Sequence, residues 1–158
     1  MSATTNPELH ELTLTRIIDA PPAKVWRCWT EPKLMKEWFT PRPWLTPVVE
    51  TDVRPGGSSL VLMRGPNGEE NPCHGVYLEV VPNKKLVFTD AFTKAWVPSG
   101  HAFMVCELTF EEVAGGKTRY TARARHWSAE DRASHEKMGF HEGWGKATDQ
   151  LEALVKTL

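Results

Sequence analysis

The sequence of 158 residues has few cysteines, no excess of charge of either sign and no long apolar run. Its three cysteines, Cys28, Cys73 and Cys106, are widely spaced and odd in number, which argues against a disulfide scaffold or a zinc ribbon. Lys and Arg total 19 and Asp and Glu total 20, and this near-neutral balance argues against a nucleic-acid-binding protein. No apolar run approaches the roughly 18 residues of a membrane-spanning helix. With no signal peptide pattern over residues 1–11, these features predict a cytoplasmic protein without membrane insertion.

Aromatic residues, by contrast, are plentiful. The chain has seven Trp, six Phe and two Tyr residues. Trp and Phe bring large apolar area, and the indole N–H of Trp needs a hydrogen-bond partner when it is buried. We therefore expect either a wide aromatic core or a cavity lined by aromatic side chains.

Hydrophobic periodicity predicts one strand, two short helices and then a run of strands. Residues 9–18 alternate apolar and polar side chains, as a strand does. Helices are expected over residues 23–30 and 32–38, where apolar side chains recur at helical spacing. Six further strands, separated by turns rich in Gly, Pro and Asn, are expected over residues 48–53, 58–64, 73–81, 86–91, 102–113 and 117–127.

The C-terminal segment predicts a long amphipathic helix. Ser128, followed by an acidic first turn, is a typical N-cap. An apolar stripe runs from Phe140 to Leu158, and we expect a break or bend near Gly139. The order of elements predicts an α+β fold, in which a curved antiparallel sheet of seven strands wraps around the last helix.

Four segments of the chain resemble the START-like, or SRPBCC, superfamily. They are IIDAPPAKVWRCWTEPKLMKEWF (17–39), the RPGG turn (54–57), HGVYLEVVPNKKLVFT (74–89) and MGFHEGWGKATDQLEALV (138–155). Within that superfamily they are most similar to the bacterial single-domain branch named for the activator of the heat-shock protein 90 ATPase. The resemblance implies a helix-grip fold with a cavity between sheet and helix, which in the superfamily holds lipids, sterols, polyketides or other apolar molecules.

On this basis we expect a flexible N-terminus over residues 1–8 and one START-like domain over residues 9–158. The leading hypothesis is that the domain binds a small hydrophobic or amphipathic ligand in the cavity, without catalysis, cofactor or metal. One alternative is an enzyme of the cyclase or hydrolase type. Another is a co-chaperone-like protein that contacts a chaperone, although the eukaryotic co-chaperone has an additional N-terminal domain. Two-fold dimers are the commonest oligomers, and this general frequency is the one argument for a homodimer.

Three polar residues are candidates for contacting a ligand. His74 and His126 each begin or end a strand whose alternate residues are apolar, so either imidazole is expected to reach the cavity mouth and bind a ligand or transfer a proton. Arg64, at the end of a strand, has the geometry to hold a carboxylate. The alternatives are a structural histidine in the first two cases and a solvent-facing arginine in the third.

Six aromatic residues complete the set of cavity candidates: Trp38, Trp44, Trp96, Phe103, Phe140 and Trp144. They come from the segments that should surround the cavity, and ligand pockets are mostly apolar. We expect Phe140 to be a core residue, and Trp38, Trp44 and Trp96 to lie at the rim.

Other chemistry-bearing residues carry no predicted site. The basic residues that alternate along residues 117–125 are expected to form a solvated face. His141 and Glu142 lack the second histidine of a metalloprotease helix. No activating signature surrounds the cysteines, so Cys28 and Cys106 are predicted to be buried and inert.

Overall fold

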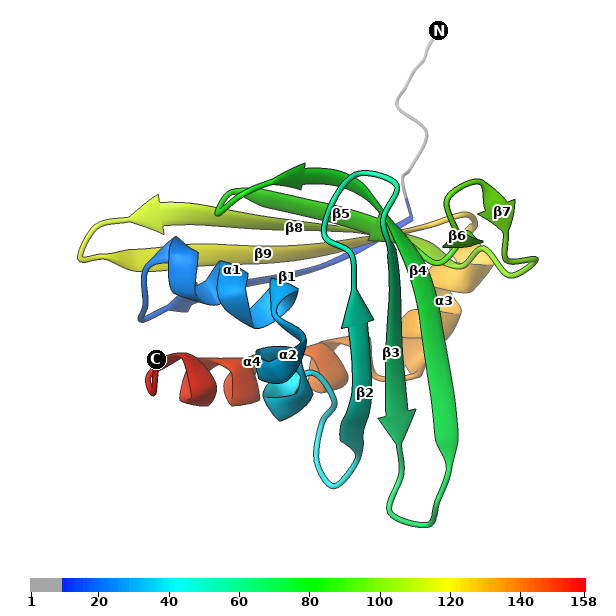
Figure 1. Ribbon diagram of the computed structural model, residues 1–158, viewed down its shortest axis with the longest axis horizontal. Helices are drawn as coiled ribbons and strands as arrows, with labels where there is room; N and C mark the ends of the chain where they lie inside the picture. Colours follow the sequence, from blue (N-terminus) through cyan, green and yellow to red (C-terminus); the bar gives the residue numbers. More distant parts are fainter. Residues whose placement is uncertain (1–9) are drawn as a thin grey trace, which may run out of the picture.

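A computed structural model describes residues 10–158, which are dominated by one antiparallel sheet of seven strands in the order β1-β9-β8-β5-β4-β3-β2 (Figure 1). The strands are β1 (Glu11–Ile18), β2 (Leu45–Thr51), β3 (Ser58–Arg64), β4 (Glu70–Val81), β5 (Lys85–Thr89), β8 (Met104–Val113) and β9 (Lys117–His126). The N-terminal strand β1 pairs with β9, so the two ends of the strand sequence meet at one side of the sheet. The expected flexible segment over residues 1–8 lies outside the described residues.

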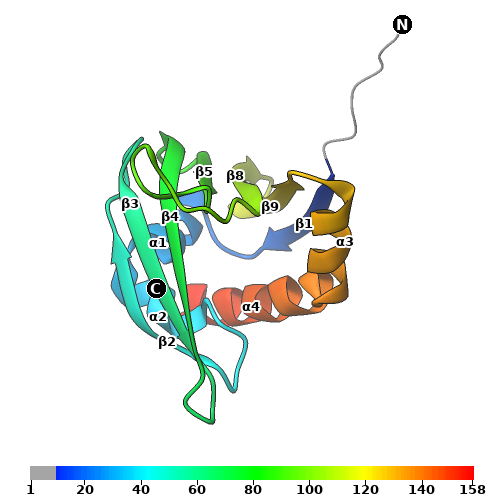
Figure 2. The ribbon, with the colours of Figure 1, turned by 90° about the vertical axis from the view of Figure 1, so that its right-hand side faces the viewer.

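The helices of this described part are α1 (Pro22–Thr30), α2 (Pro32–Trp38), α3 (Ala129–Lys137) and α4 (Phe140–Val155). Figure 2 shows that the sheet curves and that α4 crosses its open, concave side. Helix α4 packs against β1, α1, α2 and α3. This arrangement confirms the predicted α+β, helix-grip fold. None of the helices in residues 10–158 is long and apolar enough to cross a membrane.

Local signals account for the ends of the helices. Both short helices begin with a proline, Pro22 or Pro32, whose missing N–H costs nothing in a first turn. The Ser128 side chain accepts a hydrogen bond from the backbone N–H of Asp131 at 3.1 Å, so the predicted N-cap is confirmed. Gly139 has a φ of 94°, which separates α3 from α4 and confirms the predicted break.

The segment expected to be a plain loop over residues 92–101 contains a small hairpin. Its strands are β6 (Phe92–Lys94) and β7 (Val97–Pro98), and Trp96 lies at the tip with a φ of 64°. Strands of two or three residues are too short to give a periodic signal, which is why the sequence did not predict them. The hairpin packs against β4 on the outer face of the sheet.

The alternation predicted for β9 is confirmed. Its inward side chains are buried, at 5% exposure or less: Thr118, Tyr120, Ala122, Ala124 and His126. Its outward basic side chains pair with glutamates on neighbouring strands, as Arg123 does with Glu107 and Glu11. The basic row is therefore part of a solvated, charge-balanced outer face.

Candidate functional site

The concave side of the sheet holds an aromatic cluster centred on Trp29 of α1. The centroid of its ring lies 4.9 Å from that of Trp38, 5.9 Å from that of Phe88 and 6.4 Å from that of Trp144. Phe39 adds an edge-to-face contact at 5.8 Å. The cluster joins α1, α2, β5 and α4 in one apolar layer, and these aromatic geometries are favourable.

Burial on the inner face of the sheet varies from one position to the next. Cys106 and Leu108 of β8 are fully buried. Phe88 pairs with Cys106, and Cys73 pairs with the core residue Val61, so both side chains point inward. They nevertheless remain half-buried, as do Phe103, Met104 and Trp144. We call these five residues, Cys73, Phe88, Phe103, Met104 and Trp144, the inner-face site.

Two histidines meet at the α3 end of this site. The Nδ1 atom of His126 lies 2.7 Å from the carbonyl oxygen of His10, and its Nε2 atom lies 2.8 Å from Nδ1 of His135. A carbonyl can only accept, so His126 donates through Nδ1 and its neutral ring accepts at Nε2 from His135. Both nitrogens of His126 are thus engaged within the protein.

Aromatic rings surround this pair. Phe103 lies 5.3 Å from His126 and 5.1 Å from His135, and Phe140 lies 5.0 Å from His135, measured between ring centroids. Burial, with a smaller contribution from the charge that a protonated His126 would carry, lowers the pKa of His135 to about 4. Both effects favour the neutral form of His135.

Three of the candidate residues lie away from the inner face. His74 is exposed and pairs with Leu60 on the outer face. Arg64 is exposed and donates to the carboxylate of Glu70 from Nε at 3.2 Å and Nη2 at 2.7 Å. Trp96, at the tip of the β6–β7 hairpin, is 73% exposed.

The sequence pattern suggested that His74 faces the cavity, because the outer face of β4 also carries a buried apolar residue. Val76 shares the face of His74 and is fully buried, since the hairpin that begins with β6 packs against β4. Alternate apolar residues therefore did not mark the inner face here. A β-bulge between Tyr77 and Glu79 further changes the alternation beyond this point.

The remaining tryptophan candidates from the α2 region have structural contacts. Trp38 is 2% exposed, and its indole N–H donates to the carbonyl of Cys28 at 2.8 Å. Trp44 is half-buried against Gly65, where an added Cβ would come within 2.9 Å of the indole. Phe140 is 2% exposed, as expected of a core residue.

Sequence reasoning missed two residues with defined roles, His135 and Gln150. His135 lies on a helix without buried residues, so no periodic signal singles it out. The Gln150 amide donates to the carbonyls of Trp38 and Thr40 at 2.8 and 3.0 Å and accepts from the N–H of Arg42 at 3.0 Å. It fixes the loop between α2 and β2 against α4.

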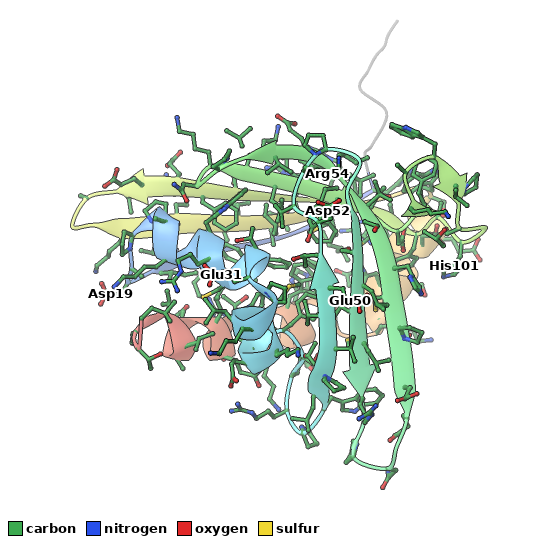
Figure 3. The ribbon with its side chains drawn as sticks, viewed as in Figure 1. Asp19, Glu31, Glu50, Asp52, Arg54 and His101 are labelled. Carbon is green, nitrogen blue, oxygen red and sulfur yellow. The ribbon has the colours of Figure 1, made fainter. Side chains whose placement is uncertain are left out.

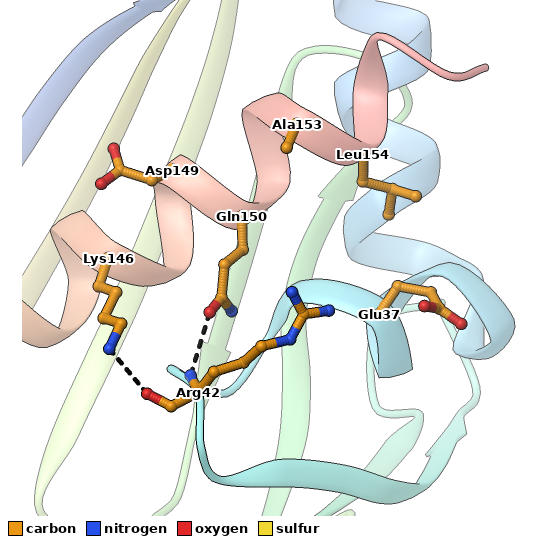
Figure 4. A pocket seen from close by; sticks show the side chains of 7 residues that line it. All are labelled: Glu37, Arg42, Lys146, Asp149, Gln150, Ala153 and Leu154. Atoms are coloured by element: carbon orange, nitrogen blue, oxygen red, sulfur yellow. Dashed lines mark hydrogen bonds between the residues drawn. The ribbon is translucent and has the colours of Figure 1, made fainter.

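Gln150 also lines an open groove of about 490 Å³ between α4 and that loop (Figure 4). Lys146 donates to the carbonyl of Arg42 at 2.7 Å across the same groove. A second depression, of about 410 Å³, lies between Trp96 and the turn that follows β2. There Arg54 donates to both oxygens of Asp52, at 3.0 and 2.8 Å (Figure 3).

The cysteines lack thiolate character. Burial raises the pKa of Cys28 to about 11 and also raises those of Cys73 and Cys106. Cys28 and Cys106 are fully buried, as predicted, whereas Cys73 is half-buried. Cys73 is therefore the cysteine whose accessibility to a reagent can be used to probe the inner face.

A curved antiparallel sheet that holds a C-terminal helix against an apolar inner face defines a helix-grip domain of the START-like, SRPBCC superfamily. Residues 19–156 match the family model described as Activator of Hsp90 ATPase homolog 1-like protein. The chain belongs to this family.

Solved structures of bacterial proteins show the same fold. A protein from Nitrosomonas europaea is 40% identical, with a TM-score of 0.91 over 96% of this chain and 97% of that one. A protein from Mycobacterium smegmatis is 27% identical, with a TM-score of 0.79 over 98% and 95% of the two chains. One from Rhodobacter sphaeroides, at 20% identity and a TM-score of 0.83 over 98% and 97%, shares the fold. No match was found among proteins with curated functions.

Proposed function

We propose that the protein binds a small hydrophobic or amphipathic molecule at the inner-face site, between the sheet and α4. The observation that carries this proposal is the half-burial of Cys73, Phe88, Phe103, Met104 and Trp144, all apolar or weakly polar. Apolar surface left in contact with water forfeits about 25 cal/mol per Å². A bound apolar molecule would recover that free energy, and cavity binding is typical of the family.

The polar groups beside the site favour an uncharged ligand. Both ring nitrogens of His126 are engaged. The Asp90 carboxylate accepts from the backbone N–H groups of Phe103 and Met104, at 2.9 and 3.1 Å. Affinity at this site would therefore come chiefly from apolar contact, with shape setting the selectivity.

Catalysis of the cyclase or hydrolase type is less well supported. This alternative requires His74, His126 or Arg64 to act in the cavity. His74 and Arg64 lie on exposed positions of β4 and β3, and His126 lies on the inner face. Acid–base catalysis requires groups within hydrogen-bond reach of one reacting centre. For the co-chaperone alternative, the family description is the sole support.

Alkylation of Cys73 provides a direct test of ligand binding. In the native full-length protein, iodoacetamide should label Cys73 while the buried Cys28 and Cys106 stay unlabelled, as read by mass spectrometry. Fatty acids, flavonoids and aromatic polyketides would then be screened for slowing that reaction. A ligand at the inner-face site should protect Cys73 by about tenfold when about 90% of the protein is bound. A reactive Cys73 that none of these molecules protects would contradict the proposal.

A matched pair of tryptophan variants separates the inner-face site from general hydrophobic adsorption. Trp144→Ala removes the indole that α4 contributes to the site, and we expect the affinity of a hit to fall about tenfold. Trp96→Ala removes the exposed indole at the tip of the β6–β7 hairpin and should leave that affinity unchanged. If both substitutions changed the affinity equally, the ligand would not bind at the inner-face site. Isothermal titration calorimetry measures both without depending on tryptophan emission.

A further inference from the structure

Helix α3 covers one end of the inner-face site, where its His135 contacts Phe103 of the site and the neighbouring core residue Phe140. None of its nine residues is fully buried, and His135 is half-buried. Within residues 10–158, two side-chain hydrogen bonds join it to the sheet. Arg132 donates from Nε to the carbonyl of Glu11 at 2.8 Å, and His135 donates to His126 at 2.8 Å. The hold of α3 on the sheet therefore depends strongly on the histidine pair.

The pair accommodates protons poorly. In the neutral arrangement the Nδ1 proton of His135 fills the space between the two rings. A proton added to Nε2 of His126 would meet that N–H head on, because both atoms would then be donors. Adding the proton to His135 instead places a charge beside Phe103 and Phe140, which offer no hydrogen-bond acceptor.

Charges on the neighbouring elements do little to offset this cost. On α3 itself, Glu136 is exposed and lies 3.6 Å from Arg132, and it also lies 3.7 Å from His141 of α4. On β1 and β9, the Glu11 carboxylate lies near the guanidinium groups of Arg123 and Arg125. The His10 imidazole adds a third titratable ring, and the Asp90 carboxylate is bonded to the backbone N–H of Phe103.

The C-terminal end of a helix favours a cation, and His135 lies in the last turn of α3. Burial nevertheless outweighs that effect, since the pKa of His135 is lowered to about 4 from an ordinary value of 6.5. Between these two values an opened α3 binds a proton that the closed form does not. Each unit of acidification in this window therefore shifts the opening equilibrium by up to about tenfold.

We propose that α3 is a lid held closed by the His126–His135 hydrogen bond and released by protonation of that pair in mildly acidic solution. Release uncovers Phe103 and Phe140 and opens one end of the inner-face site. The lid's role in controlling ligand access rests on the proposed function. Its opening is a property of the chain alone and can be measured without a ligand.

Amide hydrogen exchange of the full-length protein tests the lid. Protection factors, which remove the intrinsic effect of pH on exchange, would be measured at pH 7, 6 and 5. In the native protein we expect protection of residues 129–137 to fall by up to about tenfold per pH unit below pH 6.5, while the C-terminal half of α4 changes little. His135→Asn keeps a donor facing His126 but does not titrate, so protection of α3 should become independent of pH.

His101→Asn is the matched control, because His101 is an exposed histidine on the loop that leads to Phe103 (Figure 3). It should retain the native pH response. Equal pH dependence in the native protein and in His135→Asn would overturn the proposal. If His135→Asn perturbs α3 at neutral pH, the NMR titration of the native His135 ring decides instead. A midpoint well below 6.5 that coincides with shifts at Phe103 supports the lid, and an unperturbed midpoint overturns it.

The same measurements distinguish the two proposals. A native pH response of α3, together with no protection of Cys73 by any ligand, supports the lid and counts against the proposed function. A ligand that protects Cys73 in a protein whose α3 does not respond to pH supports the function and overturns the lid.

Discussion

Trp29 and Tyr120 share a hydrogen bond in the core, 3.1 Å from indole nitrogen to hydroxyl oxygen, across 91 positions of sequence. Both residues are buried, at 2% and 0% exposure. The bond fixes α1 to the inner face of β9 and orients the indole that Trp38, Phe88 and Trp144 contact. One polar contact therefore sets the position of the aromatic layer beside the inner-face site.

Removing the acceptor should destabilise the protein. Tyr120→Phe keeps the ring but leaves the Trp29 N–H unpaired in the core, which we expect to lower the free energy of unfolding by about 1–3 kcal/mol. Urea denaturation measures the loss. In a double-mutant cycle with Trp29→Phe, the loss caused by Tyr120→Phe should shrink, because the unpaired donor is then absent. A full loss in both backgrounds would show that the hydroxyl acts through another partner.

Gln150 gives a second prediction, which depends on pH. Gln150→Met leaves two carbonyls and one N–H without their side-chain partner, and should lower stability by roughly 1–3 kcal/mol. Gln150→Glu should be worse at neutral pH, because a carboxylate would face the carbonyls of Trp38 and Thr40. That environment raises the pKa of the introduced carboxyl above its unfolded value. The stability deficit relative to the native protein should therefore diminish as the pH falls and the acid becomes a donor.

Thermal denaturation at neutral and mildly acidic pH measures this difference. Lys146→Met is the control, since Lys146 is exposed and makes one bond to the same loop. It should change stability by less than about 0.5 kcal/mol at either pH. A Gln150→Glu deficit that grows with acidification would contradict the assigned contacts.

Local features of the fold could be predicted because their causes lie within a few residues. The Ser128 cap, the break at Gly139 and the period of β9 each follow from neighbouring side chains and backbone geometry. The overall fold followed from the order of these elements together with the family resemblance. Strand β3 has the predicted bounds, whereas β4 begins at Glu70 and not at residue 73, because the pairing of Arg64 with Glu70 depends on cross-strand contact.

The site was harder to predict because its residues meet across long stretches of sequence. His126 was chosen from its strand, but its partner His135 lies on a polar helix, and its other partner is a backbone carbonyl of His10. For His74, the β6–β7 hairpin covers an apolar residue on the outer face of β4, so the sequence pattern of this strand looks like that of a strand facing the core. A period of two identifies a strand but does not say which face a ligand could reach.

Two glycines of the α3–α4 region provide a matched pair for a third prediction. Gly139 has a φ of 94°, which an L side chain adopts only with strain, whereas Gly143 lies inside α4 with open space where a Cβ would be. Gly139→Ala should lower stability by about 1–2 kcal/mol. Gly143→Ala should raise it by about 0.5–1 kcal/mol through helix propensity. Chemical denaturation of both variants checks the sign, and stabilisation by Gly139→Ala would contradict the assigned backbone conformation.

The outer face gives a last prediction, about charge balance. The Glu107 side chain is 13% exposed and lies 3.1 Å from Arg123, 3.5 Å from Arg125 and 3.4 Å from Lys85. Among the described residues, Glu107→Gln leaves these cations with only Glu11 and Glu79 as carboxylate partners. We expect a loss of about 1–2 kcal/mol, between the values typical of exposed and of buried ion pairs.

Glu111→Gln is the control for this change, because Glu111 pairs with Arg119 alone within residues 10–158 and its side chain is 61% exposed. It should cost less than about 0.5 kcal/mol. Molar salt screens exposed charges, so the difference between Glu107→Gln and the native protein should shrink when urea denaturation is repeated in sodium chloride. If Glu107→Gln were neutral at low salt, the ion pairs of Glu107 would not contribute to stability, and the prediction would be wrong.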